Sequence, residues 1–184
     1  MKSKVIITTK KLIAVLLTLL IISSVLPSFT VKTSAAGITA TTPNKDGNGV
    51  YQIGTAAELY WFADKVNNDN ANYGSAKAVL TADIVVNTGV LKADGTLNSG
   101  TFTDWTPIGN YDNKYIGTFD GQGHTISGLY FNDTNANYVG LFGCLGTDGE
   151  IKNVGVIDSY FRGYSYVGGV CGENNSGTIT GCYN

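Results

Sequence analysis

Short apolar runs alternate with glycine, asparagine and aspartate through the second half of the chain, and they recur at a fixed distance. Tyr138-Val-Gly140 returns as Tyr166-Val-Gly168, 28 residues later (166 − 138), and Gly149 and Ile151 recur at the same distance. A fixed period of about 20–50 residues is typical of stacked-repeat architectures. Apolar runs this short, separated by turn-forming residues, favour strands over helices. The pattern therefore predicts an all-β structure of stacked, repeated units.

One segment in the first half has a helical pattern instead. Thr55 and Glu58 form a capping box, and apolar residues follow at helical spacing at Leu59, Phe62, Ala63 and Val66. The Asn/Asp run 67–70 ends this helix. Because the first unit of a repeat stack would otherwise expose its apolar cross-section, we expect the helix to cap the stack. The alternative is that Tyr60 and Trp61 form an exposed aromatic platform for a ligand.

Strands are predicted on both sides of the long polar segment 87–103, which we expect to form a protruding loop. Val50–Ile53 and residues 78–86 are rich in β-branched and aromatic residues, as strands are. Residues 105–108 are expected to re-enter the core, and further strands are predicted at 115–120 and 125–131. The side chains expected to face the core are Ile126, Leu129, Leu141, Phe142, Ile151, Val154, Val156, Val167, Val170 and Ile179.

The repeated residues resemble a known motif. Val139–Gly143 and Val167–Gly172, each followed by Gly-x-Ile, are similar to the GLUG motif, which occurs in repeated form in bacterial secreted and surface proteins. Phe119–Leu129 resembles the stretch that commonly precedes those repeats. The resemblance covers residues 50–184. It implies a right-handed parallel β-helix, a solenoid, and it implies no reaction. Together with the helix predicted from the apolar pattern, it leads us to expect a solenoid with one N-terminal capping α-helix.

The chain divides into four predicted parts. Residues 1–36 combine N-terminal lysines, an apolar run and small residues before a cleavage point, as a secretory signal peptide does. Residues 37–49 are polar, and we expect a flexible leader. Residues 50–137 are expected to hold the cap and the first coils of the solenoid. Residues 138–184 hold the GLUG-type repeats, which stop in mid-unit. They lead us to expect continuation into further repeats; the rival interpretation is a short protein whose open end pairs with a partner.

This organisation predicts a location. A signal peptide indicates export, so we expect the protein to be extracellular or at the cell surface. The apolar run inside residues 1–36 is short for a bilayer span, and no later stretch is long enough, so we expect no membrane span after signal removal.

Composition excludes several further functions. The chain has 24 glycines among 184 residues and a formal net charge of −2. Because no basic stripe is present, we expect no nucleic-acid binding. His124 is the only histidine and the sequence holds no Cys-x-x-Cys pair, so we expect no metal site and no cofactor.

The three cysteines all lie in the repeats, at Cys144, Cys171 and Cys182. A disulfide is compatible with an exported protein, and Cys144 and Cys171 lie close to one repeat apart. The interpretation that we favour is that the cysteines act as small buried hydrophobes in a core ladder. Spacing alone leaves their pairing open.

No catalytic constellation is recognisable in the sequence. His124 lies in a turn, Gly-Gln-Gly-His-Thr, without a nucleophile motif nearby, and we expect it to hydrogen-bond locally. A glycan hydrolase would need two carboxylates across a groove. The candidates show no pairing in sequence; they are Asp104, Asp112, Asp120 and Asp158. We therefore predict that the chain is not an enzyme and has no catalytic residue.

Tyrosines are the candidates for ligand contact. The weak candidates are Tyr115, Tyr130, Tyr160 and Tyr164. Exposed on a stacked sheet, such rings would pack against sugar rings or a protein partner. The alternative is that outward tyrosines make cross-strand contacts, worth about 0.2–1 kcal/mol each.

Together these features predict a non-catalytic secreted or cell-surface repeat scaffold that contributes to adhesion or surface display, with a surface glycan or a protein as partner. Two alternatives stay open. A polysaccharide-active β-helix enzyme would show an acidic cluster on one face. The non-catalytic N-terminal region of a larger secreted peptidase would be followed by a His-Glu-x-x-His sequence.

Overall fold

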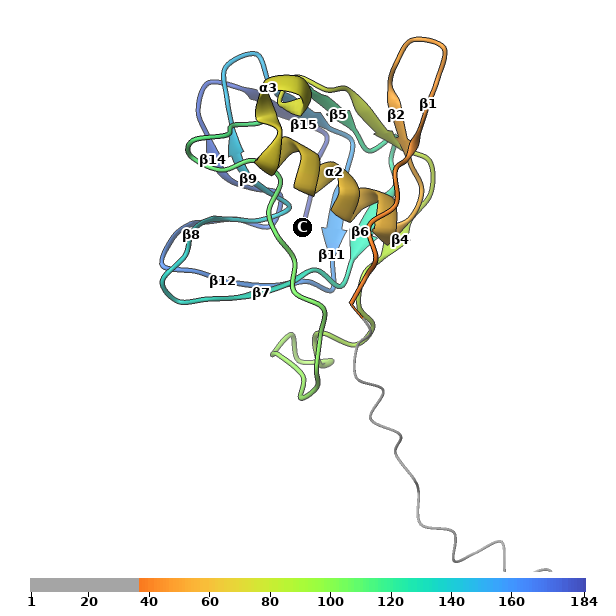
Figure 1. Ribbon diagram of the computed structural model, residues 1–184. Coiled ribbons are helices and arrows are strands. Elements are labelled where there is room, and N and C mark those ends of the chain that lie inside the picture. The colour runs from red at the N-terminus through yellow and green to blue at the C-terminus, as the bar shows by residue number, and fades with distance from the viewer. Residues whose placement is uncertain (1–36) are drawn as a thin grey trace, which may run out of the picture. The chain divides into compact units, whose positions relative to one another are not determined.

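The computed structural model describes residues 37–184, and the predicted signal peptide at 1–36 lies outside the described residues. In this part of the chain many short strands accompany two helices, α2 (Ala56–Asn68) and α3 (Asn70–Tyr73) (Figure 1). Neither helix has the length and apolar character that a membrane crossing requires. The fold is thus mainly β, as the apolar pattern predicts.

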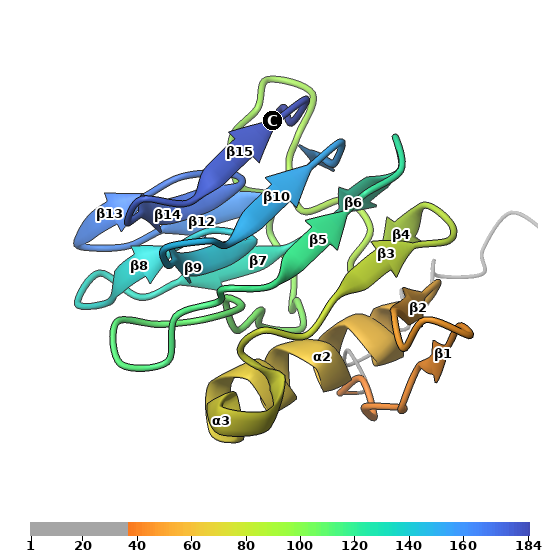
Figure 2. The ribbon, with the colours of Figure 1, turned by 90° about the horizontal axis from the view of Figure 1, so that it is seen from above.

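Two successive segments of the chain contain five strands each, and these strands pair in order. The first segment holds β5 (Thr118–Asp120), β6 (Thr125–Ser127), β7 (Tyr130–Asn132), β8 (Asn137–Val139) and β9 (Phe142–Leu145). The second holds β10 (Glu150–Lys152), β11 (Gly155–Ile157), β12 (Tyr160–Arg162), β13 (Ser165–Val167) and β14 (Cys171–Asn174). Each strand of the first segment pairs in parallel with its counterpart in the second, β5 with β10 through to β9 with β14. The two segments therefore form two layers of one stack (Figure 2).

The stack continues beyond these two layers. The longest sheet has the order β1-β2-β3-β5-β10-β15 and includes β1 (Asn44–Lys45), β2 (Tyr51–Ile53), β3 (Ala78–Leu80) and β15 (Thr178–Thr180). A second sheet adds β4 (Ile84–Val85) to β6 and β11. Among the strands of residues 37–184, only β1 runs antiparallel to its neighbour. A layer before β5 and the start of a layer after β14 thus flank the two complete ones.

Strand β1 lies inside the segment for which the sequence predicts a leader. Paired structure begins at Asn44 rather than at Val50. The reason is a tight turn held by Asp46, whose side chain accepts hydrogen bonds from the backbone amides of Asn48 and Val50, both at 2.9 Å. Aspartate commonly forms turns of this kind. The β1–β2 hairpin therefore begins within residues 37–49, and the polar composition of that segment does not reveal it.

The core consists of apolar side chains that lie above one another in successive layers. Phe119, Ile151 and Ile179 occupy equivalent positions in β5, β10 and β15. Most residues that the sequence predicts to face the core are buried; they are Ile126, Leu129, Leu141, Phe142, Ile151, Val154 and Val156. Burying a side chain of this kind contributes about 1.5–3 kcal/mol.

Three predicted core residues are not buried, and all three lie at the C-terminal end of the stack. Val167 is 45% exposed, and Val170 and Ile179 are partly exposed. In residues 37–184 no further strand lies over β13, β14 or β15, so the apolar side chains there pack on one side only. The prediction that these residues are buried was wrong for that reason.

Helix α2 covers the opposite end of the stack (Figure 2). The hydroxyl of Thr55 accepts a hydrogen bond from the Glu58 amide at 3.3 Å, and a Glu58 carboxylate oxygen accepts one from the Gly54 amide at 2.9 Å. The predicted cap by Thr55 is thus confirmed, whereas Glu58 reaches the amide of Gly54 and the hydroxyl of Thr55 rather than the Thr55 amide. The apolar face is buried as predicted, and the Phe62 ring meets the ring of Tyr115 edge-on at 5.9 Å. Tyr60 and Trp61 pack against the same core rather than forming an open platform.

The long polar segment forms a loop that leaves the stack, as predicted (Figure 1). Leu91 and Leu97 make an antiparallel bridge inside it. Asn87 closes the base of the loop. Its side-chain amide donates hydrogen bonds to the carbonyls of Thr103 and Gly128, at 3.0 and 2.8 Å, and its side-chain oxygen accepts one from the Thr103 amide.

Candidate interaction surface

Three tyrosine rings from three successive layers form one stack, here called the tyrosine stack. Tyr111 lies in the turn before β5, Tyr138 in β8 and Tyr166 in β13. The ring centroids of Tyr111 and Tyr138 lie 5.8 Å apart, and those of Tyr138 and Tyr166 lie 4.9 Å apart, with interplanar angles of 28° and 13°. Such spacing is that of stacked aromatic pairs. The spacing of these tyrosines along the chain, 27 and 28 residues, is the signal that predicts their alignment.

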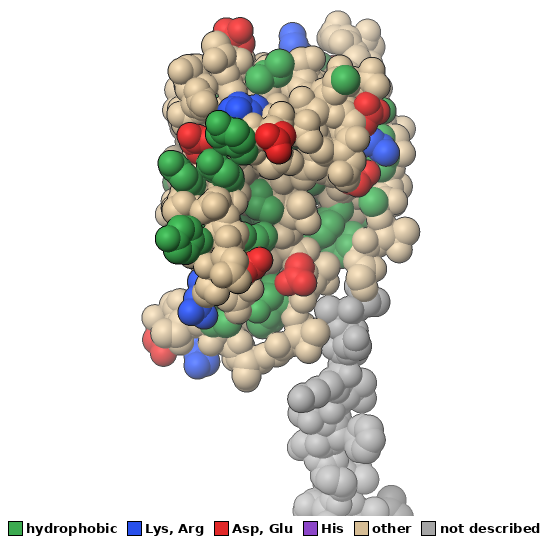
Figure 3. Space-filling model, turned by 60° about the vertical axis from the view of Figure 1, so that its left-hand side comes forward, with side chains coloured by type: hydrophobic (Ala, Val, Ile, Leu, Met, Phe, Trp, Pro, Cys, Tyr) green, Lys and Arg blue, Asp and Glu red, His purple; other side chains and the backbone are tan. Residues whose placement is uncertain are grey.

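Stacking decides what these rings can contact. Because a neighbouring ring covers each face of the Tyr138 ring, this central ring offers its edge and hydroxyl to solvent. The outer rings are about half exposed, at 57% for Tyr111 and 52% for Tyr166. Hydrophobic side chains, tyrosines included, gather along one side of this face (Figure 3). Partners that recognise aromatic edges and hydroxyl groups fit the tyrosine stack better than a sugar ring that must lie flat on an aromatic face.

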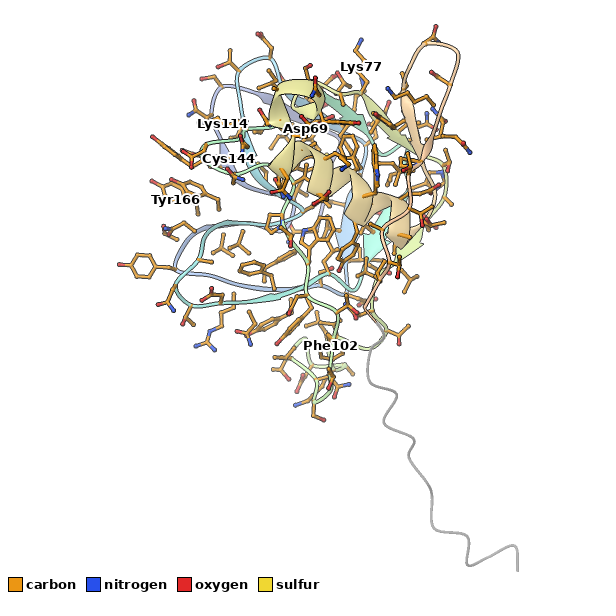
Figure 4. All side chains as sticks on the ribbon, viewed as in Figure 1. Asp69, Lys77, Phe102, Lys114, Cys144 and Tyr166 are labelled. Atoms are coloured by element: carbon orange, nitrogen blue, oxygen red, sulfur yellow. The ribbon has the colours of Figure 1, made fainter. Side chains whose placement is uncertain are left out.

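A row of polar side chains runs beside the tyrosine stack. Cys144 is opposite Glu173 in the β9–β14 pair, and the bridge between Tyr115 and Leu145 places Lys114 next to Cys144 on the other side. The Cys144 thiol donates to a Glu173 carboxylate oxygen at 3.0 Å. Lys114 and Cys144 lie on the same side of the molecule as Tyr166 (Figure 4).

The lysine of this row also holds the first ring of the stack. The Lys114 ammonium donates to the Tyr111 carbonyl at 2.6 Å and lies 4.5 Å from the centroid of the Tyr111 ring. Cations at this distance from an aromatic face are attracted by the ring quadrupole. The surface therefore combines aromatic edges with one ammonium and one carboxylate.

The surroundings of the thiol in this row disfavour its thiolate form. Burial, followed by the hydrogen bond to Glu173, raises the pKa of Cys144 to about 12, against a smaller opposite effect of Lys114. Burial likewise raises the pKa of Cys171 to about 11. A reactive cysteine needs its thiolate near neutral pH. All three cysteines are free thiols, and Cys144 is buried, which supports the interpretation of packing residues over that of a disulfide.

The four predicted ligand-contact tyrosines lie in very different surroundings. Tyr130 and Tyr160 are half-buried and stacked on each other at 6.0 Å, and Phe102 extends this second aromatic row at 5.3 Å from Tyr130. Tyr164 is 78% exposed between β12 and β13. Among the four, Tyr164 is thus the freest to contact a partner.

The prediction that Tyr115 contacts a ligand was wrong. It is fully buried, its hydroxyl donates to the Ala76 carbonyl at 2.7 Å, and its ring lies 5.3 Å from that of Phe142. Burial raises the pKa of this phenol well above its ordinary value. The hydroxyl satisfies a backbone carbonyl inside the core, which is why a tyrosine is compatible with this position.

The polar candidates for chemistry act in turns and between layers. Asp120 accepts a hydrogen bond from the Gln122 amide at 2.9 Å, as expected of a turn residue. His124 bonds locally, as predicted, because its backbone amide donates to the Gly121 carbonyl at 2.8 Å. Its side chain also reaches another layer: Nδ1 lies 3.3 Å from Asp83, which belongs to the layer before. Asp83 also accepts from the Thr125 amide at 2.8 Å, and this hydrogen bond is the first cause that lowers its pKa. The pair ties two layers together.

Comparison with known proteins places the chain beside two much longer ones. No protein-family model matches the sequence, and no solved structure matches it. The chain is 36% identical over 77 residues to a Gly-rich membrane protein of Evansella cellulosilytica, a match that covers 41% of this chain and 9% of that protein. It is 34% identical over 158 residues to halomucin of Haloquadratum walsbyi, a match that covers 78% of this chain and 2% of halomucin. The chain therefore spans less than a tenth of the length of these relatives.

Proposed function

We propose that this chain is a non-catalytic repeat scaffold, exported to the cell surface or the extracellular space, where it contributes to adhesion or surface display. The observation that carries the proposal is the ordered parallel pairing of β5–β9 with β10–β14. Because each layer contacts only its neighbours, such a stack lengthens by adding layers, and its outer surface is presented at regular intervals. A rigid, extendable support is what surface display needs.

The fold we propose is a right-handed parallel β-helix of the GLUG type, capped by α2. Its support is the combination of the GLUG-like residues with five strands per layer in the same order. Connections between parallel strands of one sheet are right-handed in almost all known proteins. The relatives' names, a membrane protein and a halomucin, accord with a surface location for this chain.

The contact surface we propose is the side that carries the tyrosine stack and Tyr164. Aromatic residues with a polar tip are favoured where a surface meets a partner, because they bury a large area and still hydrogen-bond. The partner is a surface glycan or a protein, which the ammonium of Lys114 and the carboxylate of Glu173 would help to orient.

Export is tested first. The full chain is expressed in a bacterial host with a general secretion pathway, and the culture medium, cell surface and cytoplasm are probed separately. The expected result is mature protein outside the cytoplasm with a new N-terminus directly after Ala35 or Ala36. Retention of the uncleaved chain in the cytoplasm would contradict the proposal.

Adhesion is tested on beads coated with the protein. Beads that carry the full chain are expected to bind cells or immobilised cell-surface polysaccharide. The substitutions Tyr164→Ala and Tyr166→Ala together should reduce binding at least about fivefold, as loss of contact residues does. Val85→Ala is the matched control, because Val85 is similarly exposed, at 57%, but lies on β4. Equal loss in the control, or release of sugars from the polysaccharide, would overturn the non-catalytic adhesive role.

A further inference from the structure

A groove lies between α2 and residues 106–110, closed on a third side by residues 38–40, and it has a volume of about 540 Å³. Figure 1 shows the segment that precedes β5 passing along α2. Small-molecule sites commonly occupy about 300–1,000 Å³. The groove is separate from the tyrosine stack, although the turn that carries Tyr111 begins at its edge.

The walls of the groove are held together by hydrogen bonds between α2 and the segment opposite. The Asn67 side chain donates to the Pro107 carbonyl at 2.9 Å and accepts from the Gly109 amide at 2.8 Å. The Asn113 side chain donates to the Asn67 carbonyl at 2.9 Å, and the Tyr60 hydroxyl donates to the Asp104 carbonyl at 2.8 Å. The groove is therefore preformed, so a ligand would not have to order it.

The polar groups that line the groove are neutral or acidic. Asp64 accepts a hydrogen bond from the side-chain NH₂ group of Asn68 at 2.7 Å, and the Asn68 side-chain oxygen is left as an acceptor. The Asn110 oxygen accepts from the amides of Asp112 and Asn113, which leaves its NH₂ group as a donor. Of the described lining residues none is Lys or Arg. The groove thus offers both donors and acceptors, without positive charge.

Apolar groups, one of them aromatic, form one side of the groove. The Tyr60 ring lines the groove and is held edge-on against Trp105 at 5.1 Å. Pro107 and Ala63 complete this wall. Sugars present apolar C–H faces and a rim of hydroxyls, each hydroxyl being both donor and acceptor, and this matches a wall of ring and aliphatic groups beside carboxamide and carboxylate groups.

From this lining we infer that the groove beside α2 binds a neutral saccharide of one to three residues. The Asp64 carboxylate lines the groove, whereas its cationic neighbour Lys65, 3.5 Å away, does not, so the lining disfavours uronic acids and phosphates. Asp64 and the two asparagines can hydrogen-bond sugar hydroxyls. The inference names a ligand class for the proposed adhesive role and rests on that role for its biological purpose. Binding in the groove is measurable independently of it.

The test is a titration of the ¹⁵N-labelled full chain with cellotriose, maltotriose and triacetylchitotriose, followed through backbone amide shifts. At least one trisaccharide is expected to bind with a dissociation constant on the order of 1 mM. The shifts should centre on α2 and residues 106–110. Trigalacturonate, which is anionic, should bind at least about tenfold more weakly because of Asp64.

The variant for the test is Asp64→Ala with Asn68→Ala. These two side chains hydrogen-bond each other on the exposed face of α2, so the fold should persist, and the amide spectrum verifies it. Affinity should fall at least about fivefold, as expected when two hydrogen-bonding groups are lost. Asn72→Ala is the matched control, since Asn72 bonds only to Asp69 on exposed α3 and lies outside the groove.

Three outcomes would overturn the inference: no shifts with any neutral trisaccharide at 20-fold the expected dissociation constant, shifts that the double variant leaves unchanged, or equal binding of trigalacturonate. Shifts that centre on Tyr164 and Tyr166 instead would overturn the groove as the site while supporting the adhesive surface. Groove binding without bead adhesion would uphold the inference and refute the proposed adhesion.

Discussion

The rings of Tyr138 and Tyr166 lie nearly parallel at 4.9 Å, although the two residues are 28 positions apart (166 − 138). Both residues also have a positive φ, 63° and 55°, which side-chain-bearing residues rarely adopt. The same unusual local conformation therefore recurs one layer later. Its recurrence fixes both side chains on the same side of the stack, and contact between the rings offsets part of the backbone strain.

The position of a residue within a core ladder should decide how much it contributes to stability. Ile151 and Ile179 are paired across β10 and β15, but Ile151 is fully buried and Ile179 is partly exposed. Ile151→Ala should lower the free energy of unfolding by about 2–5 kcal/mol. Ile179→Ala should cost less than half as much, because less apolar surface is lost. Urea denaturation measures both, and equal losses would contradict the one-sided packing of the last layer.

Close approach of backbones should make one glycine irreplaceable. Gly95 and Gly128 have similar positive φ values, 79° and 74°, but a Cβ at Gly95 would meet open space, whereas one at Gly128 would meet the Asn87 carbonyl. Gly95→Ala should cost about 1–2 kcal/mol for the left-handed backbone alone. Gly128→Ala should cost about 3 kcal/mol or more, because overpacking is added. Thermal unfolding of the two variants compares them directly. Similar midpoint temperatures would show that the backbone around Asn87 shifts to accommodate the new methyl group, against the prediction.

The hydrogen bonds of Asn67 should hold α2 to the rest of the molecule. Asn67→Ala removes two side-chain bonds to backbone groups and should lower the free energy of unfolding by about 1–3 kcal/mol. Asn72→Ala, on the exposed surface of α3, should change it by about 0.5 kcal/mol or less. Chemical denaturation measured by circular dichroism checks this. A smaller loss for Asn67 than for Asn72 would mean that the cap is held by apolar packing alone.

Alkaline pH should destabilise the protein partly through Cys144. The folded-state pKa is raised from 9.0 to about 12, so the folded protein holds this proton more tightly than the unfolded chain does. The stabilisation is complete below pH 9 and is lost as pH rises towards 12. Unfolding free energies measured from pH 8 to 11 should fall less steeply in Cys144→Ala. Iodoacetamide at pH 8 should label Cys144 only after unfolding in urea, and rapid labelling of the native protein would contradict its burial.

Local sequence signals predicted those elements that depend on local interactions. The capping box at Thr55 and the apolar spacing from Leu59 to Val66 specify α2 without reference to the rest of the chain, and the structure has the helix at Ala56–Asn68. The recurrence of Tyr138 as Tyr166 likewise predicted which residues align between layers. Repetition is readable from sequence because equivalent positions face equivalent surroundings.

The burial of a side chain that packs against other layers could not be predicted from local sequence signals. Tyr115 and Tyr164 are both tyrosines near turns, yet one is fully buried beneath α2 and the other is the most exposed of the candidates. Val167 repeats the motif of buried Val139 but has no layer above it. The groove beside α2 brings together residues about 40 positions apart, none of which forms a motif in sequence.

The helix over the first layer gives the molecule two unlike ends. A sheet with unpaired edges at both ends would invite copies to dock head to tail without limit, which is the geometry of a fibre. Here α2 covers the apolar cross-section of that end, and the edge strand beside it, β1, is only two residues long and runs antiparallel to β2. An arriving parallel strand would therefore find little edge to join at the end that carries the helix.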